Sequence, residues 1–79
     1  MKLVYIIQSQ KDKSYYVGIT ENIAKRLEEH NSGSSKYSSV KRPYFLVWYC
    51  GFQDDKKAYT FERYLKAGSG IAFRNKHLI

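Results

Sequence analysis

Glu62 is a carboxylate at a position where an apolar side chain is expected. It follows Ala58 by four residues and precedes Leu65 by three, so it stands beside the apolar stripe of an expected helix. At the edge of a core, a carboxylate can bind a metal ion, take part in catalysis, or pair with a cation one helical turn away. Lys66, four residues later, can supply that cation. The sequence leaves both interpretations of Glu62 open.

Arg26 and His30 are two further candidates, on an earlier expected helix. Arg26 lies three residues after Ile23 and one before Leu27, at the border of that helix's apolar face. Its guanidinium can neutralise an anion, or its aliphatic stem can cover the border while the charge stays in water. His30 extends the stripe that begins at Ile23. It is a candidate general base or a hydrogen-bonded histidine at the core edge.

Tyr5 and Tyr16 belong to two short segments that are rich in strand-forming residues. If these strands pair and the rings share a face, their hydroxyls converge, because cross-strand neighbours lie about 5 Å apart. Gly18, two residues after Tyr16, indicates either a close approach of another group to the backbone or a β-bulge. Cys50 lies in another apolar run and is expected to be a buried, unreactive thiol.

Local patterns predict the elements that position Tyr5, Tyr16, Arg26 and His30. Residues 3–7 and 15–19 predict a β-hairpin with a longer loop, because both runs are rich in β-branched and aromatic residues and the stretch between them is polar. A helix is expected over residues 21–30, with Thr20 as its N-cap. Gly33 is expected to take the left-handed conformation that ends this helix.

The second half of the chain predicts one more strand and one more long helix. The nearly unbroken apolar run of residues 44–50 is expected to be the central strand. Asp54 can cap a helix that runs to about Ala67 and ends at the glycines of residues 68–70. Residues 71–79 predict only a short turn. These elements give an α+β fold, a small and mostly antiparallel three-stranded sheet flanked by helices, in the order β-β-α-β-α.

Length and composition limit which classes of protein this chain can belong to. The chain of 79 residues is long enough for a single domain, residues 1–79, without a second core. No apolar stretch approaches the roughly 20 residues of a membrane span, and no signal-peptide pattern is present, so a cytoplasmic protein with no membrane contact is expected. One cysteine and two histidines exclude a Cys/His metal cage. The net charge of +7 favours nucleic acid as a partner, through contacts with phosphates.

Four short motifs, taken together, resemble those of the GIY-YIG nuclease family in order and spacing. The matching residues are Leu3-Val4-Tyr5, Tyr16-Val17-Gly18, Arg26 with His30, and Glu62 with Lys66. The first motif has leucine and valine where the family name has glycine and isoleucine, so only Tyr5 carries over. The chain is most similar to the small stand-alone bacterial members, which consist of little beyond this domain.

The resemblance implies an endonuclease that hydrolyses nucleic-acid phosphodiesters with one divalent ion, Mg²⁺ or Mn²⁺, bound by Glu62. A hard cation of this kind can bind through one carboxylate and keep several waters. Arg26 would neutralise charge that develops on the phosphate, and Tyr5 or Tyr16 would position or deprotonate the attacking water. Because a tyrosine pKa of about 10 makes a poor base, Arg26 or the metal would have to lower it. His30 completes the implied catalytic set.

DNA is the expected partner, bound through phosphate contacts from the basic residues Lys36, Lys41, Arg42 and Lys66. Gly18 is expected to shape the site. Specificity is expected to come from a protein partner, from nucleic-acid structure or from the loop of residues 34–43, since larger relatives aim the same domain with separate recognition or repair domains. Two alternatives remain. One is a non-catalytic nucleic-acid-binding module of the same fold, acting with a DNA-repair or recombination partner; the other is a basic RNA-binding protein whose motif match is accidental.

Overall fold

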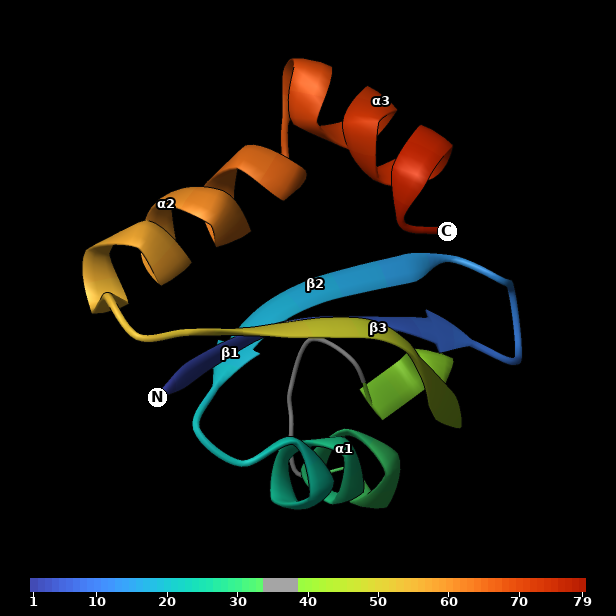
Figure 1. Ribbon diagram of the computed structural model, residues 1–79. Coiled ribbons are helices and arrows are strands. Elements are labelled where there is room, and N and C mark those ends of the chain that lie inside the picture. Colours follow the sequence, from blue (N-terminus) through green and yellow to red (C-terminus); the bar gives the residue numbers. More distant parts are fainter. Residues whose placement is uncertain (34–38) are drawn as a thin grey trace.

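A three-stranded sheet lies between helices on both of its faces (Figure 1). The elements of the computed structural model, which describes residues 1–33 and 39–79, are β1 (Lys2–Ser9), β2 (Tyr15–Thr20), α1 (Ile23–Ser32), the short 3₁₀ helix η1 (Ser39–Lys41), β3 (Tyr44–Phe52), α2 (Asp55–Leu65) and α3 (Gly68–His77). Both strand pairs are antiparallel, in the order β2-β1-β3. Helices α2 and α3 lie on one side of the sheet and α1 on the other. The predicted α+β class and antiparallel sheet are confirmed.

The central strand is β1, so the prediction that residues 44–50 form the centre of the sheet is wrong. Residues 4–7 of β1 are all buried, because helices cover both of its faces, whereas β3 exposes Phe45, Tyr49 and Cys50. The aromatic run of β3 therefore reflects strand propensity more than burial. The expectation of a buried Cys50 is wrong for the same reason.

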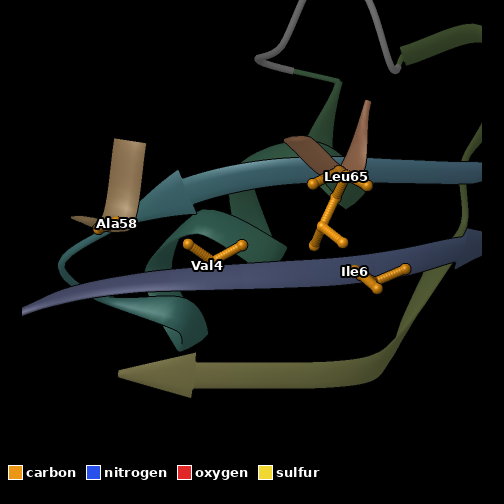
Figure 2. Packing of buried hydrophobic residues seen from close by; sticks show 5 residues of the cluster. Val4, Ile6, Ala58 and Leu65 are labelled. Atoms are coloured by element: carbon orange, nitrogen blue, oxygen red, sulfur yellow. The ribbon is translucent and has the colours of Figure 1, made fainter. Parts of the chain in front are cut away.

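Side-chain alternation along the hairpin divides the core into two clusters. Val4, Ile6 and Val17 pack against Ala58 and Leu65 of α2 (Figure 2). The intervening residues of β1 point to the opposite face, where α1 and the first residues of β3 cover them. The hairpin therefore presents one apolar face to α2 and a second, tyrosine-containing face to α1.

Helix α1 begins two residues later than the sequence predicted. Asn22 is its N-cap, and the Asn22 side-chain oxygen accepts a hydrogen bond of 3.1 Å from the backbone N–H of Lys25. Thr20, the predicted cap, ends β2, and its hydroxyl oxygen accepts a hydrogen bond from the Asn22 N–H instead. The predicted left-handed Gly33 is confirmed, with a φ of 86° that glycine adopts without steric cost.

The C-terminal segment forms the helix α3, where the sequence predicted only a turn. Asp54 caps α2 as predicted, and α2 ends at Leu65. The glycines of residues 68–70, which the sequence predicted would end α2, begin α3 instead, and Lys66 is the C-cap of α2. A Cβ on Gly70 would overlap the carbonyl oxygen of Tyr64, so the absence of a side chain lets α3 pack on the end of α2. In the part of the chain that the structure describes, no helix has the length and apolar character that crossing a bilayer requires.

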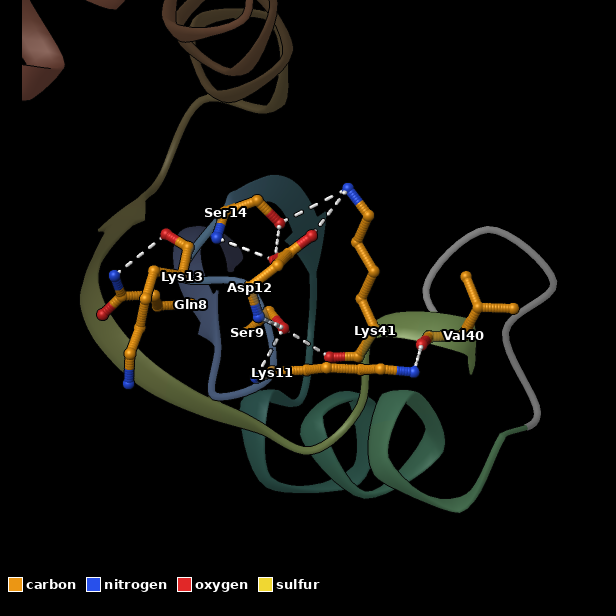
Figure 3. A network of polar contacts seen from close by, with 8 residues as sticks. All are labelled: Gln8, Ser9, Lys11, Asp12, Lys13, Ser14, Val40 and Lys41. Carbon is orange, nitrogen blue, oxygen red and sulfur yellow. Dashed lines mark hydrogen bonds and ion pairs between the residues drawn. The ribbon is translucent and has the colours of Figure 1, made fainter.

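Polar contacts around Ser9 tie the β1–β2 turn to η1 (Figure 3). The Ser9 side chain is fully buried, and its hydroxyl donates a hydrogen bond of 2.6 Å to the carbonyl of Lys41. The same oxygen accepts hydrogen bonds from the backbone N–H groups of Lys11 and Asp12, at 3.0 and 3.2 Å. These contacts fix the segment before β3 against the hairpin.

Candidate active site

Gly18 allows the Tyr5 ring to lie directly on β2. Tyr5 pairs with Gly18 in the hairpin, and Ile7 pairs with Tyr16, so the two tyrosines are diagonal neighbours on one face of the sheet. A Cβ at position 18 would overlap the Tyr5 hydroxyl oxygen and lie 2.5 Å from its Cζ. The group that approaches the Gly18 backbone is therefore Tyr5. The register shift of the sheet lies elsewhere, between Ile6 and Ile7 in the pairing with β3.

His30 of α1 contacts both tyrosines. Its side chain has no exposed surface, and Nε2 shares a hydrogen bond of 2.9 Å with the hydroxyl of Tyr5. Its ring centroid lies 4.8 Å from that of Tyr16 and 5.7 Å from that of Tyr44. Burial lowers the pKa of His30 to about 4, and the charge of Arg26 contributes in the same direction. The ring is therefore neutral at pH 7.

Arg26 lies one helical turn before His30 and interacts with Tyr5. Its Nη1 forms an ion pair of 3.0 Å with Glu29, and this contact, followed by the interaction with Tyr5, raises the pKa of Arg26. Arg26 acts on the pKa of Tyr5 in the expected direction, downward, but burial outweighs it and the pKa of Tyr5 is raised. At neutral pH the Tyr5 hydroxyl is therefore protonated, so Arg26 does not by itself lower the Tyr5 pKa enough to make it a base.

Glu62 belongs to the buried face of α2, and its charge acts on Tyr5. It is 9% exposed and forms an ion pair with Lys66, the i, i+4 pair that the sequence allowed. The Lys66 ammonium in turn lies 6.0 Å from the centroid of the Tyr16 ring. The Glu62 charge also contributes to the raised pKa of Tyr5. The carboxylate thus stands within electrostatic reach of the hydroxyl that His30 binds.

We call Tyr5, Tyr16, Arg26, His30 and Glu62 the tyrosine cluster. Two strands and two helices contribute to it. Tyr5, Tyr16, Arg26 and His30 interact directly, whereas Glu62 is linked to them through Lys66, whose ammonium lies near the Tyr16 ring. The sequence predicted that all five line one surface groove, and the structure does not place all five along one cavity. The cavity next to the cluster is lined by Arg26 but not by the other four.

The donor set near the cluster suits a metal ion that keeps most of its waters. Among the described residues, no three His, Cys, Asp or Glu side chains gather in a group that could enclose an ion. Glu29 is held by Arg26, and Glu62 by Lys66. Because the Lys66 side chain is 47% exposed, its ammonium can swing into water and leave Glu62 to a divalent cation. One carboxylate with water ligands is a known binding mode for Mg²⁺.

The four predicted phosphate-contact residues differ in their surroundings. Lys36 lies outside the described residues. Lys41 pairs with Asp12 at 3.4 Å in the network of Figure 3, and Lys66 pairs with Glu62. The Arg42 guanidinium lies close to Gly33. Lys41 and Lys66 are thus partly neutralised, so they present less positive charge than the sequence indicated.

Three residues that support the cluster were missed from the sequence: Glu29, Asn31 and Tyr44. Glu29 could have been found, because a spacing of three from Arg26 brings opposite charges together on a helix. The Asn31 amide exchanges hydrogen bonds with the backbone of Tyr44, with its Nδ2 3.1 Å from the carbonyl and its Oδ1 2.6 Å from the N–H. No local pattern connects Asn31 and Tyr44, since only the fold brings them together.

Comparison with known proteins identifies the family. A family model of the GIY-YIG catalytic domain matches residues 1–71. The UPF0213 protein CPE1444 of Clostridium perfringens is 39% identical over 67 residues, which are 84% of this chain and 71% of that protein. The UPF0213 protein YazA of Bacillus subtilis is 36% identical over 63 residues, 78% of this chain and 63% of that protein.

A solved structure agrees with the sequence match. The solution NMR structure of the UPF0213 protein BH0048 from Bacillus halodurans has a TM-score of 0.52 and 32% identity, and the match covers 84% of this chain and 71% of that chain. Because the family match spans most of the sequence, the alternative of an accidental motif match is wrong. The chain belongs to the GIY-YIG family, whose catalytic domain is nuclease-like.

Proposed function

We propose that this chain hydrolyses phosphodiester bonds of nucleic acid, with one divalent ion, Mg²⁺ or Mn²⁺, held by Glu62. DNA is the proposed substrate, and a protein partner is the proposed source of specificity. The observation that carries the proposal is the hydrogen bond between Tyr5 and His30, at a place where Arg26 and Glu62 both act on the same hydroxyl. The membership of a nuclease-like family supports it.

Tyr5 is proposed to position the attacking water and not to deprotonate it. Its raised pKa keeps the proton on the hydroxyl, and a His30 with a pKa of about 4 is also a weak base at pH 7. With its own hydrogen on Nδ1, His30 accepts the Tyr5 proton in a hydrogen bond, which leaves the Tyr5 oxygen free to accept one from water. Tyr16 packs against His30 and helps to fix this orientation. A divalent ion, when bound, supplies a more acidic water.

Arg26 is proposed to stabilise negative charge on the phosphate. Its side chain is partly exposed, and the ion pair with Glu29 fixes the direction of the guanidinium before substrate arrives. A preorganised cation costs little reorganisation when charge develops on an oxygen in the transition state. Lys66, once displaced from Glu62, is proposed to contact a phosphate as well.

A non-catalytic nucleic-acid-binding module is the second candidate function. The Glu62–Lys66 ion pair favours it, because this pair satisfies the buried carboxylate without a metal ion. The two candidates share the fold and the nucleic-acid partner. They differ in whether Glu62 binds a divalent ion strongly enough to displace Lys66.

A cleavage assay with matched variants tests the proposal. Plasmid DNA, branched DNA, single-stranded DNA and RNA are incubated with the protein in Mg²⁺, in Mn²⁺ and in EDTA. We expect metal-dependent cleavage that Glu62→Gln abolishes while circular dichroism shows an unchanged fold. Glu28→Gln, which removes an exposed carboxylate of α1, is the control and should cleave normally. Arg26→Ala should slow cleavage by on the order of 10²-fold or more and leave Mn²⁺ binding intact.

The outcomes separate the candidates. Cleavage by Glu62→Gln at the rate of the unaltered protein would contradict the metal proposal. Binding of nucleic acid without cleavage in either metal would favour the second candidate. A preference for RNA over DNA would correct the proposed substrate and leave the chemistry unchanged.

A further inference from the structure

A cavity of about 420 Å³ opens beside Arg26, where β2 leads into α1. Ligand-binding cavities have volumes of roughly 300–1,000 Å³, so it is large enough for a small ligand. Its lining is entirely polar or charged and consists of Lys2, Thr20, Glu21, Asn22, Lys25, Arg26 and Glu29. A cavity lined by no apolar or aromatic residue suits a hydrated, charged ligand and not a stacked base.

The charges of this cavity favour an anion. Its carboxylates are both neutralised, Glu21 by Lys2 at 3.2 Å and Glu29 by Arg26 at 3.0 Å. Lys25 forms no ion pair with any of residues 1–33 or 39–79, and its side chain is exposed. Three cations against two carboxylates leave the lining with a net charge of +1. Within the described chain, the lining charge that has no counterion is that of Lys25.

The position of the cavity along α1 relates it to the tyrosine cluster. Asn22 and Lys25 lie within one helical turn before Arg26, and His30 lies one turn after it. Arg26 therefore stands between the cavity and the Tyr5–His30 pair and belongs to both. Successive phosphates of a nucleic-acid strand are joined by one nucleotide, so a strand with one phosphate at Arg26 places the next one in the neighbourhood of the cavity.

We propose that this cavity is a subsite for the phosphate next to the scissile one, with Lys25 as the residue that contacts it. This inference rests on the proposed function, because Arg26 serves as the link between the subsite and the reacting phosphate. Lys2 and Glu21 form one wall, and their ion pair keeps Lys2 from competing with Lys25. Substrate contact there would fix the register of the strand.

Salt-dependent binding of a fluorescent 10-nucleotide single-stranded DNA tests the subsite. Binding constants are measured from 25 to 200 mM NaCl in EDTA, so that no cleavage occurs. Lys25→Gln should reduce the slope of log K against log salt by about 0.7, the loss of one phosphate contact on a single strand. Lys25→Arg should restore the slope. Lys57→Gln, an exposed lysine of α2 outside the cavity, is the matched control and should behave as the unaltered protein does.

A second arm places a single uncharged methylphosphonate at successive positions of the DNA. The unaltered protein should lose affinity at the position that Lys25 contacts, and Lys25→Gln should be insensitive at that position alone. Equal slopes for Lys25→Gln and Lys57→Gln, or no binding of the DNA at 25 mM NaCl, would overturn the subsite. These readouts need no cleavage, so a failure of the nuclease proposal would show separately, as inactivity of the unaltered protein.

Discussion

The contact of Tyr5 with Gly18 makes Gly18→Ala a sharp test of the site's packing. The new Cβ would overlap the Tyr5 hydroxyl oxygen and would lie 2.5 Å from Cζ and 2.9 Å from Cε2. The ring cannot withdraw freely, because its hydroxyl is bonded to the buried His30. Gly18→Ala should therefore move Tyr5 and weaken or break the bond to His30.

The cost follows from two effects that act together. Overpacking a well-packed core costs about 1–3 kcal/mol, and leaving a buried hydrogen-bonding group unsatisfied costs about 1–3 kcal/mol. Replacing glycine by alanine in a strand gains at most about 1 kcal/mol through the unfolded state. The expected loss is therefore about 1–6 kcal/mol, set against a total of roughly 4–12 kcal/mol for a chain of this size.

A double-mutant cycle in urea unfolding isolates the contact. Tyr5→Leu removes the atoms that the new Cβ would meet, since leucine ends before Cε2, Cζ and the hydroxyl. In the Tyr5→Leu background Gly18→Ala should lose most of its cost, so most of the expected loss should appear as coupling free energy between the two positions. Tyr5→Phe should relieve only part of the strain, because Cζ remains. The same cost for Gly18→Ala with and without the tyrosine ring would refute the reasoning.

Three further predictions concern stability and metal binding. The free energy of unfolding should fall as the pH drops from about 6.5 towards 4, by up to about 1.4 kcal/mol per pH unit. In this range the histidine of the unfolded chain binds a proton, whereas folded His30, with its pKa of about 4, stays neutral. His30→Gln should remove this slope in urea titrations above about pH 5, where carboxylates contribute little. Ser9→Ala should cost about 1–3 kcal/mol by the same measurement, and Ser69→Ala, which removes an exposed hydroxyl of α3, less than about 0.5 kcal/mol. Lys66→Met should tighten Mn²⁺ binding at Glu62 by roughly two- to fivefold in electron paramagnetic resonance titrations, and weaker binding would contradict competition by the ammonium.

The elements that the sequence predicted well are those with local signals. The hairpin follows from two runs of strand formers, Gly33 from the need for a left-handed residue, and the start of α2 from the Asp54 cap. Two of the predictions that failed concern how elements pack. The run of β3 has the composition of a central strand, but the helices lie over β1, and the packing of α3 on the end of α2 requires the missing side chain of Gly70. The N-cap of α1 failed locally, because Thr20 still belongs to β2 and Asn22 caps the helix.

The candidate site shows the same division. The spacing of four between Arg26 and His30 placed them on neighbouring turns of one helix, and that of Glu62 and Lys66 allowed the ion pair that the structure contains. The contact between the rings of Tyr44 and His30 could not be predicted, since it depends on how the chain returns to the sheet after α1. The direction of the Tyr5 pKa shift could not be predicted from the sequence either, because it depends on how deeply the ring is buried.

The position of Glu62 depends on how α2 packs against the sheet. Ala58, Glu62 and Leu65 share the buried face of α2, and the two apolar members pack on the Val4, Ile6 and Val17 face of the hairpin. Tyr5 alternates with Val4 and Ile6 along the same strand and points to the opposite face. A change that shifts α2 on this apolar face therefore moves Glu62 relative to Tyr5, even where it touches neither residue. Substitutions in the Figure 2 core should for this reason alter any metal-dependent activity before they unfold the chain.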